Sequence, residues 1–580
     1  MSRLRFMWKY IKRHIWQFVL GILSLFVVDY ALLFIPSLTA SVTDGLTAHA
    51  ITMDDVWYYV VCILAVGAII TAGRFFWRFF FFGGSRSIEK ELRDDMFEHL
   101  EQMDVEYYNE KKTGDLMSKF TSDLNSVRMA LGPAVISSFD ASAMAIMVIC
   151  QMLFFVDVKL TLLAMIPMIL IAIGELYYGK LIRVRFKERQ EAISSLTDYT
   201  QESFSGVRVI KSFVRERAEL RAFAKENANA QNKNLRVVKV QAVVMPLLDV
   251  VIGISSLITL MYGGYLALTG VITLGKFIAF NQYIGMLVWP MLACGEAITM
   301  FSQGGASIRR IQDIFDAKPM VNDEGETVDV DKLQGQLTFN HLSYTHKNAT
   351  EETLKDINLH VEAGTTLAVI GRTGSGKTTL VNLLLRLYNT EPDMILLDGY
   401  DIGKIPLKVL RENIAYVPQD NFLFSDTLRA NIAFGAEDDI EKVQAAAKAA
   451  CVHDNIVDFP DGYETIVGER GVTLSGGQKQ RSSIARALMK DAPILILDDA
   501  LSAVDTDTEE QILTNLKKNR AGKTTILIAH RISTIQNADI IMVLDEGKAA
   551  EIGNHSELME LGGIYRDMFE KQQLEMEVDK

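Results

Sequence analysis

The chain has 580 residues, of which 49% are hydrophobic and 23% charged, and its formal net charge at pH 7 is −13. This hydrophobic content excludes an intrinsically disordered chain, because low hydrophobicity is the signature of disorder. Residues 1–319 contain 33 Lys and Arg against 29 Asp and Glu, whereas residues 320–580 contain 26 against 43. The more polar half is thus strongly acidic, which argues against nucleic acid as a partner. The four widely spaced cysteines predict neither a disulfide framework nor a zinc site.

Long apolar stretches dominate the first half, and each approaches or exceeds the roughly 20 residues that span a bilayer. The first is longer than the apolar part of a signal peptide, so we interpret it as a retained span. The basic segment before it, residues 3–14, is predicted to lie flat in the membrane interface. We predict an α-helical membrane domain over residues 1–319, in contact with the lipid bilayer, with six spans at about 15–35, 56–82, 133–156, 159–178, 243–268 and 277–301.

Basic residues alternate between the segments that join these stretches. Segments 83–132 and 179–242 contain seven and fourteen Lys and Arg, whereas segment 36–55 contains none. Because basic loops stay in the cytoplasm, we predict a multi-pass protein of the plasma (inner) membrane with both termini cytoplasmic. Both long loops show helical periodicity, so the spans are expected to continue into the cytoplasm. A turn at each tip, 107–116 and 201–213, is a candidate for docking onto another domain, and a solvated hairpin is the alternative.

The composition changes near residue 319, where a linker is predicted. Short apolar strands then alternate with helices over 320–580, the pattern of an α/β domain with a largely parallel sheet. One strand runs into GRTGSGKTT, and this P-loop motif turns backbone N–H groups toward phosphate oxygens at a helix N-terminus. The predicted phosphate-binding residues are Gly371, Arg372, Thr373, Gly374, Ser375, Gly376, Lys377, Thr378 and Thr379.

The chemistry of such a loop assigns roles to individual side chains. Lys377 is expected to reach the β- and γ-phosphates of a nucleotide, and the Thr378 hydroxyl to ligate Mg²⁺. The metal also needs a carboxylate at a strand end. The segment APILILDD, residues 492–499, reads as a buried strand that presents Asp498 for this purpose.

A second anion site is predicted at the start of the helix in LSGGQKQRSSIARAL, residues 474–488. Ser475, Gly476 and Gly477 would expose backbone amides and a hydroxyl at the helix N-terminus. The alternative for Ser475, taken by itself, is an ordinary helix N-cap that binds no anion. Two phosphate-binding surfaces would then lie about a hundred residues apart in one chain.

These motifs carry a family resemblance. The segments GRTGSGKT, YVPQD (416–420), LSGGQ (474–478), ILILDD, SAVD (502–505) and IAHR (528–531) stand in the order found in ATP-binding-cassette ATPases. Six spans ahead of one cassette resemble a half-size exporter of the multidrug type, over nearly the whole chain. The resemblance implies the six-span type IV (type I exporter) membrane fold, an α/β P-loop ATPase domain over 320–580, and ATP and Mg²⁺ as cofactors.

The resemblance also implies roles for matching positions. Tyr344 resembles the aromatic residue that stacks on adenine, Gln419 the glutamine that senses Mg²⁺ and the attacking water, and His530 the histidine that contacts the γ-phosphate. Asp505 resembles an aspartate that communicates between the two cassettes across the dimer interface. In this family the signature, here Ser475, Gly476, Gly477 and Gln478, closes over ATP held by the P-loop of a second cassette. The tips near Tyr108 and Phe213 resemble coupling helices.

One residue departs from the family pattern. The position after the Mg²⁺ aspartate usually carries Glu, the general base, and here it carries Asp499. Asp is shorter by one methylene, and a displacement of about 1 Å can cost roughly a hundredfold in rate. We therefore expect this chain to bind ATP well and to hydrolyse it poorly at its own P-loop. Its intact LSGGQ could complete a competent site on a partner.

The leading hypothesis is one subunit of a heterodimeric, ATP-driven exporter of small hydrophobic or cationic molecules. The alternatives are an importer on the same fold, for example of siderophores, and a homodimeric lipid or peptide exporter. A soluble ATP-dependent switch protein conflicts with the predicted spans, and an ATP-gated channel remains a fourth class. Five acidic residues lie in the predicted spans: Asp140, Glu175, Asp249 and Glu296 toward the cytoplasmic ends and Asp29 in the outer half. If several face a cavity, that cavity would favour lipophilic cations; the alternative is that they reach interface water or pair with Arg74 and Arg78.

Overall fold

The computed structural model describes residues 3–347, 349–468, 471 and 474–578. They form two compact units, each described separately below. The first contains Met1–Glu101 and Thr113–Ala317, and the second contains Gln102–Lys112 and Lys318–Lys580. The second unit therefore begins at Lys318 and includes the tip of the first long loop, which sequence reasoning assigns to the membrane domain.

The described part of the first unit is built from helices, and several are far longer than a bilayer requires. Helix α3 has 49 residues, or roughly 73 Å at 1.5 Å per residue, against a hydrocarbon core of about 30 Å. The predicted continuation of the spans is thus confirmed. The elements are α1 (Arg3–Leu32), α2 (Phe34–Thr47), α3 (Met53–Glu101), α5 (Thr113–Ser118), η1 (Lys119–Asp123), α6 (Leu124–Leu131), α7 (Pro133–Gln151), η2 (Met152–Val156), α8 (Val158–Ser205), α9 (Val207–Ser212), α10 (Glu216–Ile258), η3 (Thr259–Gly263), α11 (Gly264–Leu268) and α12 (Leu274–Asp316).

Within the described residues, five helical segments are long and apolar enough to cross a membrane. A shorter apolar helix, Val158–Leu170, coincides with the fourth predicted span at the start of α8. Six spans therefore remain a prediction. The five segments are Arg5–Thr47, Met53–Glu101, Thr113–Val156, Glu216–Leu268 and Leu274–Asp316.

The basic N-terminal segment is continuous with α1, and its predicted position in the membrane interface stays a prediction. Its polar side chains pair with the far half of α3. Lys9 Nζ lies 2.9 Å from Asp95 Oδ2, and Arg13 Nη1 lies 3.0 Å from Glu91 Oε2. Tyr10, only 1% exposed, also donates to Asp95. The charges that suggested a membrane surface also join two helices.

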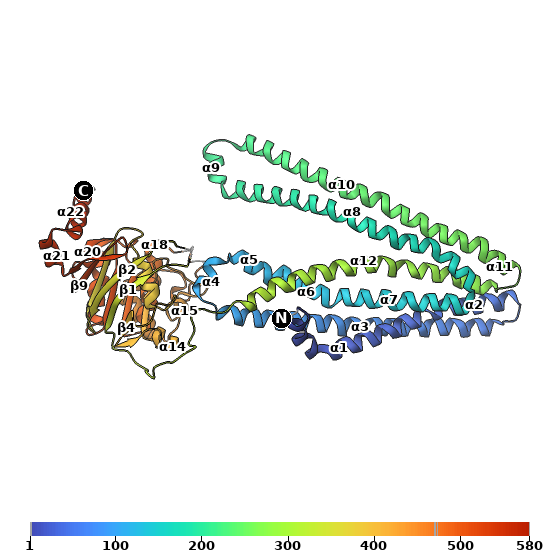
Figure 1. Cartoon of the computed structure of the whole chain (residues 1–580), viewed down its shortest axis with the longest axis horizontal. Helices are drawn as coiled ribbons and strands as arrows, with labels where there is room; N and C mark the ends of the chain where they lie inside the picture. Colours follow the sequence, from blue (N-terminus) through green and yellow to red (C-terminus); the bar gives the residue numbers. More distant parts are fainter. Residues whose placement is uncertain (1–2, 348, 469–470, 472–473, 579–580) are drawn as a thin grey trace. The chain divides into compact units, whose positions relative to one another are not determined.

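The helices of this unit form a parallel array in which α8 and α10 make a long hairpin (Figure 1). Short helix α9 closes the hairpin, and both predicted loop-tip helices are present, the other being α4 (Val105–Glu110). Helices α2 and α12 meet closely at Gly275. Its N–H donates to Asp44 Oδ1 at 2.7 Å, and an added Cβ would lie 2.1 Å from the Ala40 carbonyl oxygen. Only glycine fits at this contact.

The second unit contains two β-sheets flanked by helices, as an α/β domain predicts. A mostly parallel sheet has the order β10-β9-β3-β8-β7-β6, and an antiparallel sheet has the order β2-β1-β4-β5. The strands are β1 (Leu337–Tyr344), β2 (Leu354–Val361), β3 (Thr366–Gly371), β4 (Ile395–Leu397), β5 (Tyr400–Asp401), β6 (Ile414–Val417), β7 (Ile494–Asp498), β8 (Thr524–Ile528), β9 (Ile540–Asp545) and β10 (Lys548–Gly553).

The helices of this unit follow the strands in the alternation that the sequence indicates. Besides α4, they are α13 (Lys377–Leu384), α14 (Leu407–Glu412), α15 (Leu428–Ile432), α16 (Ile440–Ala449), α17 (His453–Val457), the 3₁₀ turn η4 (Gly462–Glu464), α18 (Gly476–Met489), α19 (Thr506–Asn519), α20 (Ile532–Ile535), α21 (His555–Leu561) and α22 (Ile564–Val578).

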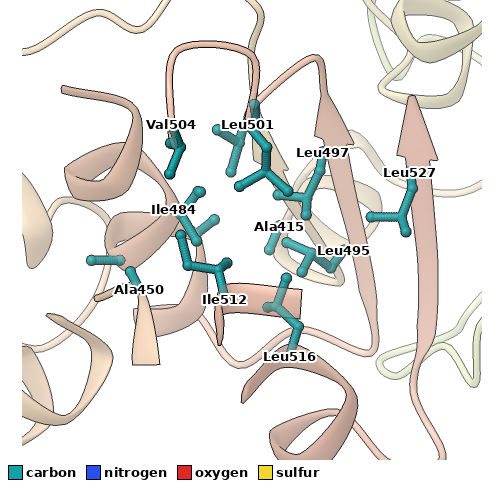
Figure 2. Packing of buried hydrophobic residues seen from close by; sticks show 14 of the residues in the cluster. Ala415, Ala450, Ile484, Leu495, Leu497, Leu501, Val504, Ile512, Leu516 and Leu527 are labelled. Atoms are coloured by element: carbon teal, nitrogen blue, oxygen red, sulfur yellow. The ribbon is translucent and has the colours of Figure 1, made fainter. Parts of the chain in front are cut away.

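The larger sheet is buried on both faces, which explains its continuous apolar strands. Side chains of β7 alternate between two cores: Leu495 and Leu497 face one, and Ile494 and Ile496 face the other. Figure 2 shows Leu495 and Leu497 in the same cluster as Ile484 of α18 and Leu516 of α19. Each such side chain contributes roughly 1.5–3 kcal/mol by burial. This packing fixes the strand end at which Asp498 lies.

Candidate nucleotide-binding site

The parallel strands of the larger sheet all end at one edge, and the predicted site residues follow those ends. In the register, Asp498 of β7 pairs with Ile528 of β8, and Val369 of β3 also pairs with Ile528. The P-loop follows β3, Gln419 follows β6, Asp499 follows β7, and His530 follows β8. Sequence segments up to about 160 residues apart are thereby brought to one place.

The P-loop adopts backbone conformations that require glycine at two positions. Gly374 has φ +83° and Gly376 has φ +103°, in the left-handed region that other residues rarely adopt. Gly371 is required for space, since an added Cβ would lie 2.1 Å from the Leu544 carbonyl oxygen. The loop leads directly into α13, whose N-terminal amides favour an anion.

Lys377 forms hydrogen bonds to the backbone of its own P-loop. Its Nζ donates to the carbonyl oxygens of Gly371 at 2.8 Å and Arg372 at 2.9 Å. Burial lowers the pKa of this ammonium group, and the nearby carboxylates of Asp498 and Asp499 act in the opposite direction. The hydrogen-bond partners of the ammonium group are thus neutral carbonyl oxygens. A phosphate oxygen would be a stronger acceptor for this positive charge.

A pocket of about 260 Å³ lies in front of the loop and joins most of the predicted side chains. Gln419, Asp499 and His530 contribute from the other strand ends. Gly371, Arg372 and Ser375 of the predicted set are not among the lining residues. The lining residues are Thr353, Thr373, Gly374, Gly376, Lys377, Thr378, Thr379, Gln419, Asp498, Asp499, Ile528 and His530.

Asp498 has the features of a metal-binding carboxylate. It is 1% exposed, and its Oδ2 has no hydrogen-bond partner among the described residues. Burial raises its pKa to about 6, against a hydrogen bond from Thr378. A buried carboxylate with an unused oxygen beside a hydroxyl is a suitable oxygen donor set for Mg²⁺. The residues present therefore fit the metal that the sequence implies.

Asp499 has an uncommon backbone conformation, with φ +49°. Asp tolerates this region better than most residues with side chains. Its N–H donates to the Ile528 carbonyl oxygen at 2.9 Å, and its own carbonyl oxygen accepts from Ser502 Oγ at 3.1 Å. The short carboxylate is thus held on a fixed backbone at the pocket wall.

Tyr344 lies beside the phosphate pocket rather than among its lining residues. Its ring centroid is 5.0 Å from that of His346 and 6.1 Å from that of Tyr388. His346 Nε2 in turn lies 3.3 Å from Thr379 Oγ1 in α13. An aromatic surface therefore adjoins the P-loop helix, where a nucleotide base would extend from the phosphates.

The signature segment caps α18. Gln478 N–H donates to Ser475 Oγ at 3.3 Å, while Ser475 N–H donates to Gln478 Oε1 at 3.0 Å. The helix cap weighed from the sequence is thus real, and both polar side chains take part in it. Ser475, Gly476, Gly477 and Gln478 are not among the residues that line the P-loop pocket of their own chain.

Sequence reasoning missed Gln480, which joins the signature helix to the residues after β7. Its side chain is 5% exposed, its Oε1 accepts from the Ala503 N–H at 2.9 Å, and its Nε2 donates to Ser502 Oγ at 3.1 Å. The Asp499 carbonyl oxygen lies 3.5 Å from the same Nε2. The signal was present as a polar residue on the apolar face of α18, but its partners are distant in sequence.

Gln480→Leu is expected to lower ATP hydrolysis roughly tenfold while leaving Mg-ATP affinity within about twofold. The substitution keeps the volume but leaves the Ala503 N–H without its acceptor, which costs about 1–3 kcal/mol. Steady-state ATPase assays and nucleotide titrations measure the two effects. Gln511→Leu, on the exposed side of α19, is the control. Equal effects of both substitutions on hydrolysis would contradict this role for Gln480.

A second missed residue, Gln572, comes from the C-terminal helix α22. Its Nε2 donates to the His530 carbonyl oxygen at 2.7 Å, and its Oε1 accepts from the Ile532 N–H at 2.9 Å. One side chain therefore holds the backbone at His530 and at Ile532, two residues further on.

Helix α4 belongs to this unit and contacts it through polar groups. Asp104 caps α4 by accepting from the Tyr107 N–H at 3.0 Å, and it also accepts from the Met320 N–H at 2.7 Å. Asn109 Nδ2 donates to the Tyr388 hydroxyl at 3.0 Å, and Lys347 Nζ lies 3.2 Å from Glu110 Oε1. For the first loop tip, docking is the correct alternative and the solvated hairpin is not.

Comparison with known proteins agrees with this geometry. Residues 18–291 match the family described as ABC transporter transmembrane region, and residues 354–502 match that described as ABC transporter. The chain is 40% identical over 559 residues to the probable multidrug resistance ABC transporter ATP-binding/permease protein YheI of Bacillus subtilis (strain 168), covering 96% of this chain and 95% of that one. It is 37% identical over 569 residues to the multidrug resistance-like ATP-binding protein MdlA of Escherichia coli (strain K12), covering 98% and 96%.

Two further relatives bear on the fold and on function. The ATP-dependent lipid A-core flippase of Syntrophus aciditrophicus (strain SB) is 37% identical over 496 residues, which is 85% of this chain and 81% of that one. The structure of a bacterial Atm1-family ABC exporter with ATP bound superposes with a TM-score of 0.78 and 26% identity, covering 97% and 98% of the two chains.

Fold and site together define a multi-pass membrane protein with a P-loop ATPase unit. The chain belongs to the ABC transporter family. Its ATPase unit binds ATP, and the family relationship makes it an ATP-driven transporter.

Proposed function

We propose that the chain is one subunit of an exporter of hydrophobic or cationic small molecules in the plasma membrane, with six spans and both termini in the cytoplasm. The relatives named for multidrug resistance match over nearly their whole length. The single observation that carries the proposal is the pocket that gathers Lys377, Asp498, Asp499 and His530 at one sheet edge. Efflux of a fluorescent lipophilic dye from cells that express the transporter, with and without ATP depletion, tests it. ATP-independent or absent efflux would contradict it.

Within that pocket, we assign separate tasks to the residues. Thr378, Gln419 and Asp498 would hold Mg²⁺, which neutralises phosphate charge when bound. Lys377 and the P-loop amides would bind the β- and γ-phosphates, and Tyr344 would stack on the base. Asp499, Gln419 and His530 would orient water at the γ-phosphate; Asp499 accepts the proton.

The subunit is proposed to work in a heterodimer with a second half-transporter. The signature cap lies outside its own chain's pocket, which supports its use by a P-loop on another chain. The short Asp499, held at φ +49°, supports slow hydrolysis at the chain's own P-loop. Hydrolysis would then occur mainly at the partner's P-loop, closed by Ser475, Gly476, Gly477 and Gln478 of this chain.

Gly477→Asp is expected to stop ATP hydrolysis by the complex, because it places a carboxylate against the γ-phosphate of the partner-bound ATP. The structure requires a steric control, since any Cβ at Gly477 would lie 2.9 Å from the Ala503 carbonyl oxygen. Gly477→Ala supplies that control and is expected to retain at least a tenth of the activity. ATPase rates and bound ATP per complex are measured for both. Equal rates for the Ala and Asp variants would remove charge repulsion at a composite site as the cause.

A homodimeric lipid exporter is the second candidate function. The relative named as a lipid A-core flippase, at 37% identity, favours it. It would place Asp499 at both ATP sites. Purification of the tagged chain from its native cells separates the two assemblies: a second half-transporter in equal amount supports the heterodimer, and the chain alone supports the homodimer. An importer, for example of siderophores, is the remaining alternative and is tested by the direction of ATP-dependent transport in vesicles.

A further inference from the structure

Two carboxyl groups meet inside the membrane unit, from helices distant in sequence. Asp29 on α1 lies against Asp140 on α7. Each is a little past the middle of its spanning segment, Arg5–Thr47 and Thr113–Val156. Sequence reasoning placed Asp140 toward the cytoplasmic end of its span and Asp29 in the outer half of the first span, and it did not foresee that the two side chains meet. The side chain of Glu175 lies outside the described residues.

Asp29 is almost completely buried, and only one of its two carboxyl oxygens lacks a partner among the described residues. It is 1% exposed, and its Oδ2 has no hydrogen-bond partner in the described part of the chain. Carboxylate oxygens only accept hydrogen bonds, so two ionised carboxylates cannot satisfy each other. An ionisable group in a spanning segment is costly unless paired. This geometry needs a positive charge between or beside the two groups.

The surrounding helices supply one such charge. Arg74 on α3 acts electrostatically on Asp29, and Asp140 is the other charged group that does so. From α12, the group that reaches the pair is neutral: Trp289 Nε1 donates to Asp140 Oδ2 at 3.3 Å. Two carboxylates and one guanidinium leave one negative charge uncompensated. The missing positive charge must come from a bound proton or a bound cation.

The neighbouring aromatic ring indicates which kind of cation fits. Trp289 is 57% exposed, so much of its indole surface remains free beside Asp140. Carboxylates together with an open indole face attract organic cations, whose charge is spread over an apolar surface.

We propose that Asp29, Asp140 and Trp289 form a binding site for the charged group of a lipophilic organic monocation. The inference rests on the proposed export of small molecules and names the substrate contact. In the absence of substrate, one proton is shared between the two carboxyl groups. When the cation binds, that proton leaves to solvent, so the charge of the site is conserved.

Equilibrium binding of tetraphenylphosphonium to the nucleotide-free transporter in lipid nanodiscs tests this site. Asp140→Asn and Asp29→Asn are each expected to weaken binding at least tenfold. Neither should change the binding of triphenylphosphine oxide, a neutral molecule of similar shape, more than twofold. Asp198→Asn is the matched control, since it removes the same charge from an exposed position in α8 outside the predicted spans, and it should leave both probes unaffected. Release of one proton for each tetraphenylphosphonium bound, in weakly buffered solution, is the second readout.

Equal loss in the Asp198 and Asp140 variants, unchanged binding in both pair variants, or binding without proton release would overturn the proposal. If Asp29→Asn does not fold, Asp140→Asn carries the same test from a partly exposed position. Failure of the exporter function itself is distinguishable: the wild-type transporter would then bind neither probe, and neither would change its ATPase rate. Intact binding of the neutral probe with no effect of the pair overturns the cation site alone.

Discussion

Lys377→Ala is expected to abolish ATP-dependent transport and to weaken ATP binding at this chain's P-loop at least tenfold. Among the described residues that line the pocket, Lys377 is the only one with a permanent positive charge. Its Nζ now bonds to the carbonyl oxygens of Gly371 and Arg372, bonds that phosphate oxygens would replace. Removing the ammonium group leaves the loop amides and the polar side chains of the pocket to bind several negative charges without a lysine.

Transport of a dye into inverted vesicles and titration with a fluorescent ATP analogue measure these effects. Lys548→Ala removes an exposed lysine from β10 and should change neither quantity by more than twofold. Wild-type affinity for ATP in the Lys377 variant would show that the pocket in front of the P-loop does not hold the phosphates.

The second large effect concerns Asp499. It distinguishes the ATP hydrolysis of this subunit from that of its partner in the proposed heterodimer. Purified alone, this chain should show little ATPase activity and no transport. In the complex, Asp499→Asn should change turnover less than about threefold, whereas Glu→Gln at the matching position of the partner should lower it at least a hundredfold. The physical reason is reach: a base displaced by about 1 Å can lose roughly a hundredfold in rate.

Asp499→Glu tests the same idea by gain of function. The longer side chain should raise hydrolysis at this chain's P-loop severalfold, at a backbone cost of about 1 kcal/mol in the left-handed region. Asp507→Glu, at an exposed position in the first turn of α19, is the control for lengthening a nearby carboxylate. Robust transport by the chain alone in proteoliposomes, or a stopped complex after Asp499→Asn, would refute the assigned asymmetry.

The nucleotide site was largely predictable, because its residues follow strand ends in short motifs. Lys377, Thr378, Gln419, Asp498, Asp499 and His530 are all brought to one pocket as parallel strands require. The family resemblance assigned Tyr344 to the nucleotide base, and the residue lies at the end of β1, beside the phosphate pocket. Sequence periodicity alone could not give its distance from the P-loop. Gln480 and Gln572 act through backbone groups far along the chain, so no local pattern distinguishes them from other polar residues.

The membrane unit was predictable in outline and less so in its pairing. Hydropathy located the apolar stretches, because every backbone group in a bilayer must bond within a helix. It did not show that helix continues through α2 to Thr47 or that Asp29 meets Asp140. It also could not show that Lys9 and Arg13 pair with acids on α3. Charge composition reports which residues need partners but not where those partners lie.

The two hydrogen bonds that the Asp104 carboxylate accepts connect two parts of the chain. One carboxylate holds both the end of α4 and the start of the chain that follows α12, and His99 Nε2 lies 3.0 Å from the Ala317 carbonyl oxygen just before it. The ends of α3 and α12 are thereby joined where the chain passes into the second unit, so a displacement of one is expected to move the other. In the proposed heterodimer, the tip of the α8–α10 hairpin in α9 would remain for the partner's cassette to contact.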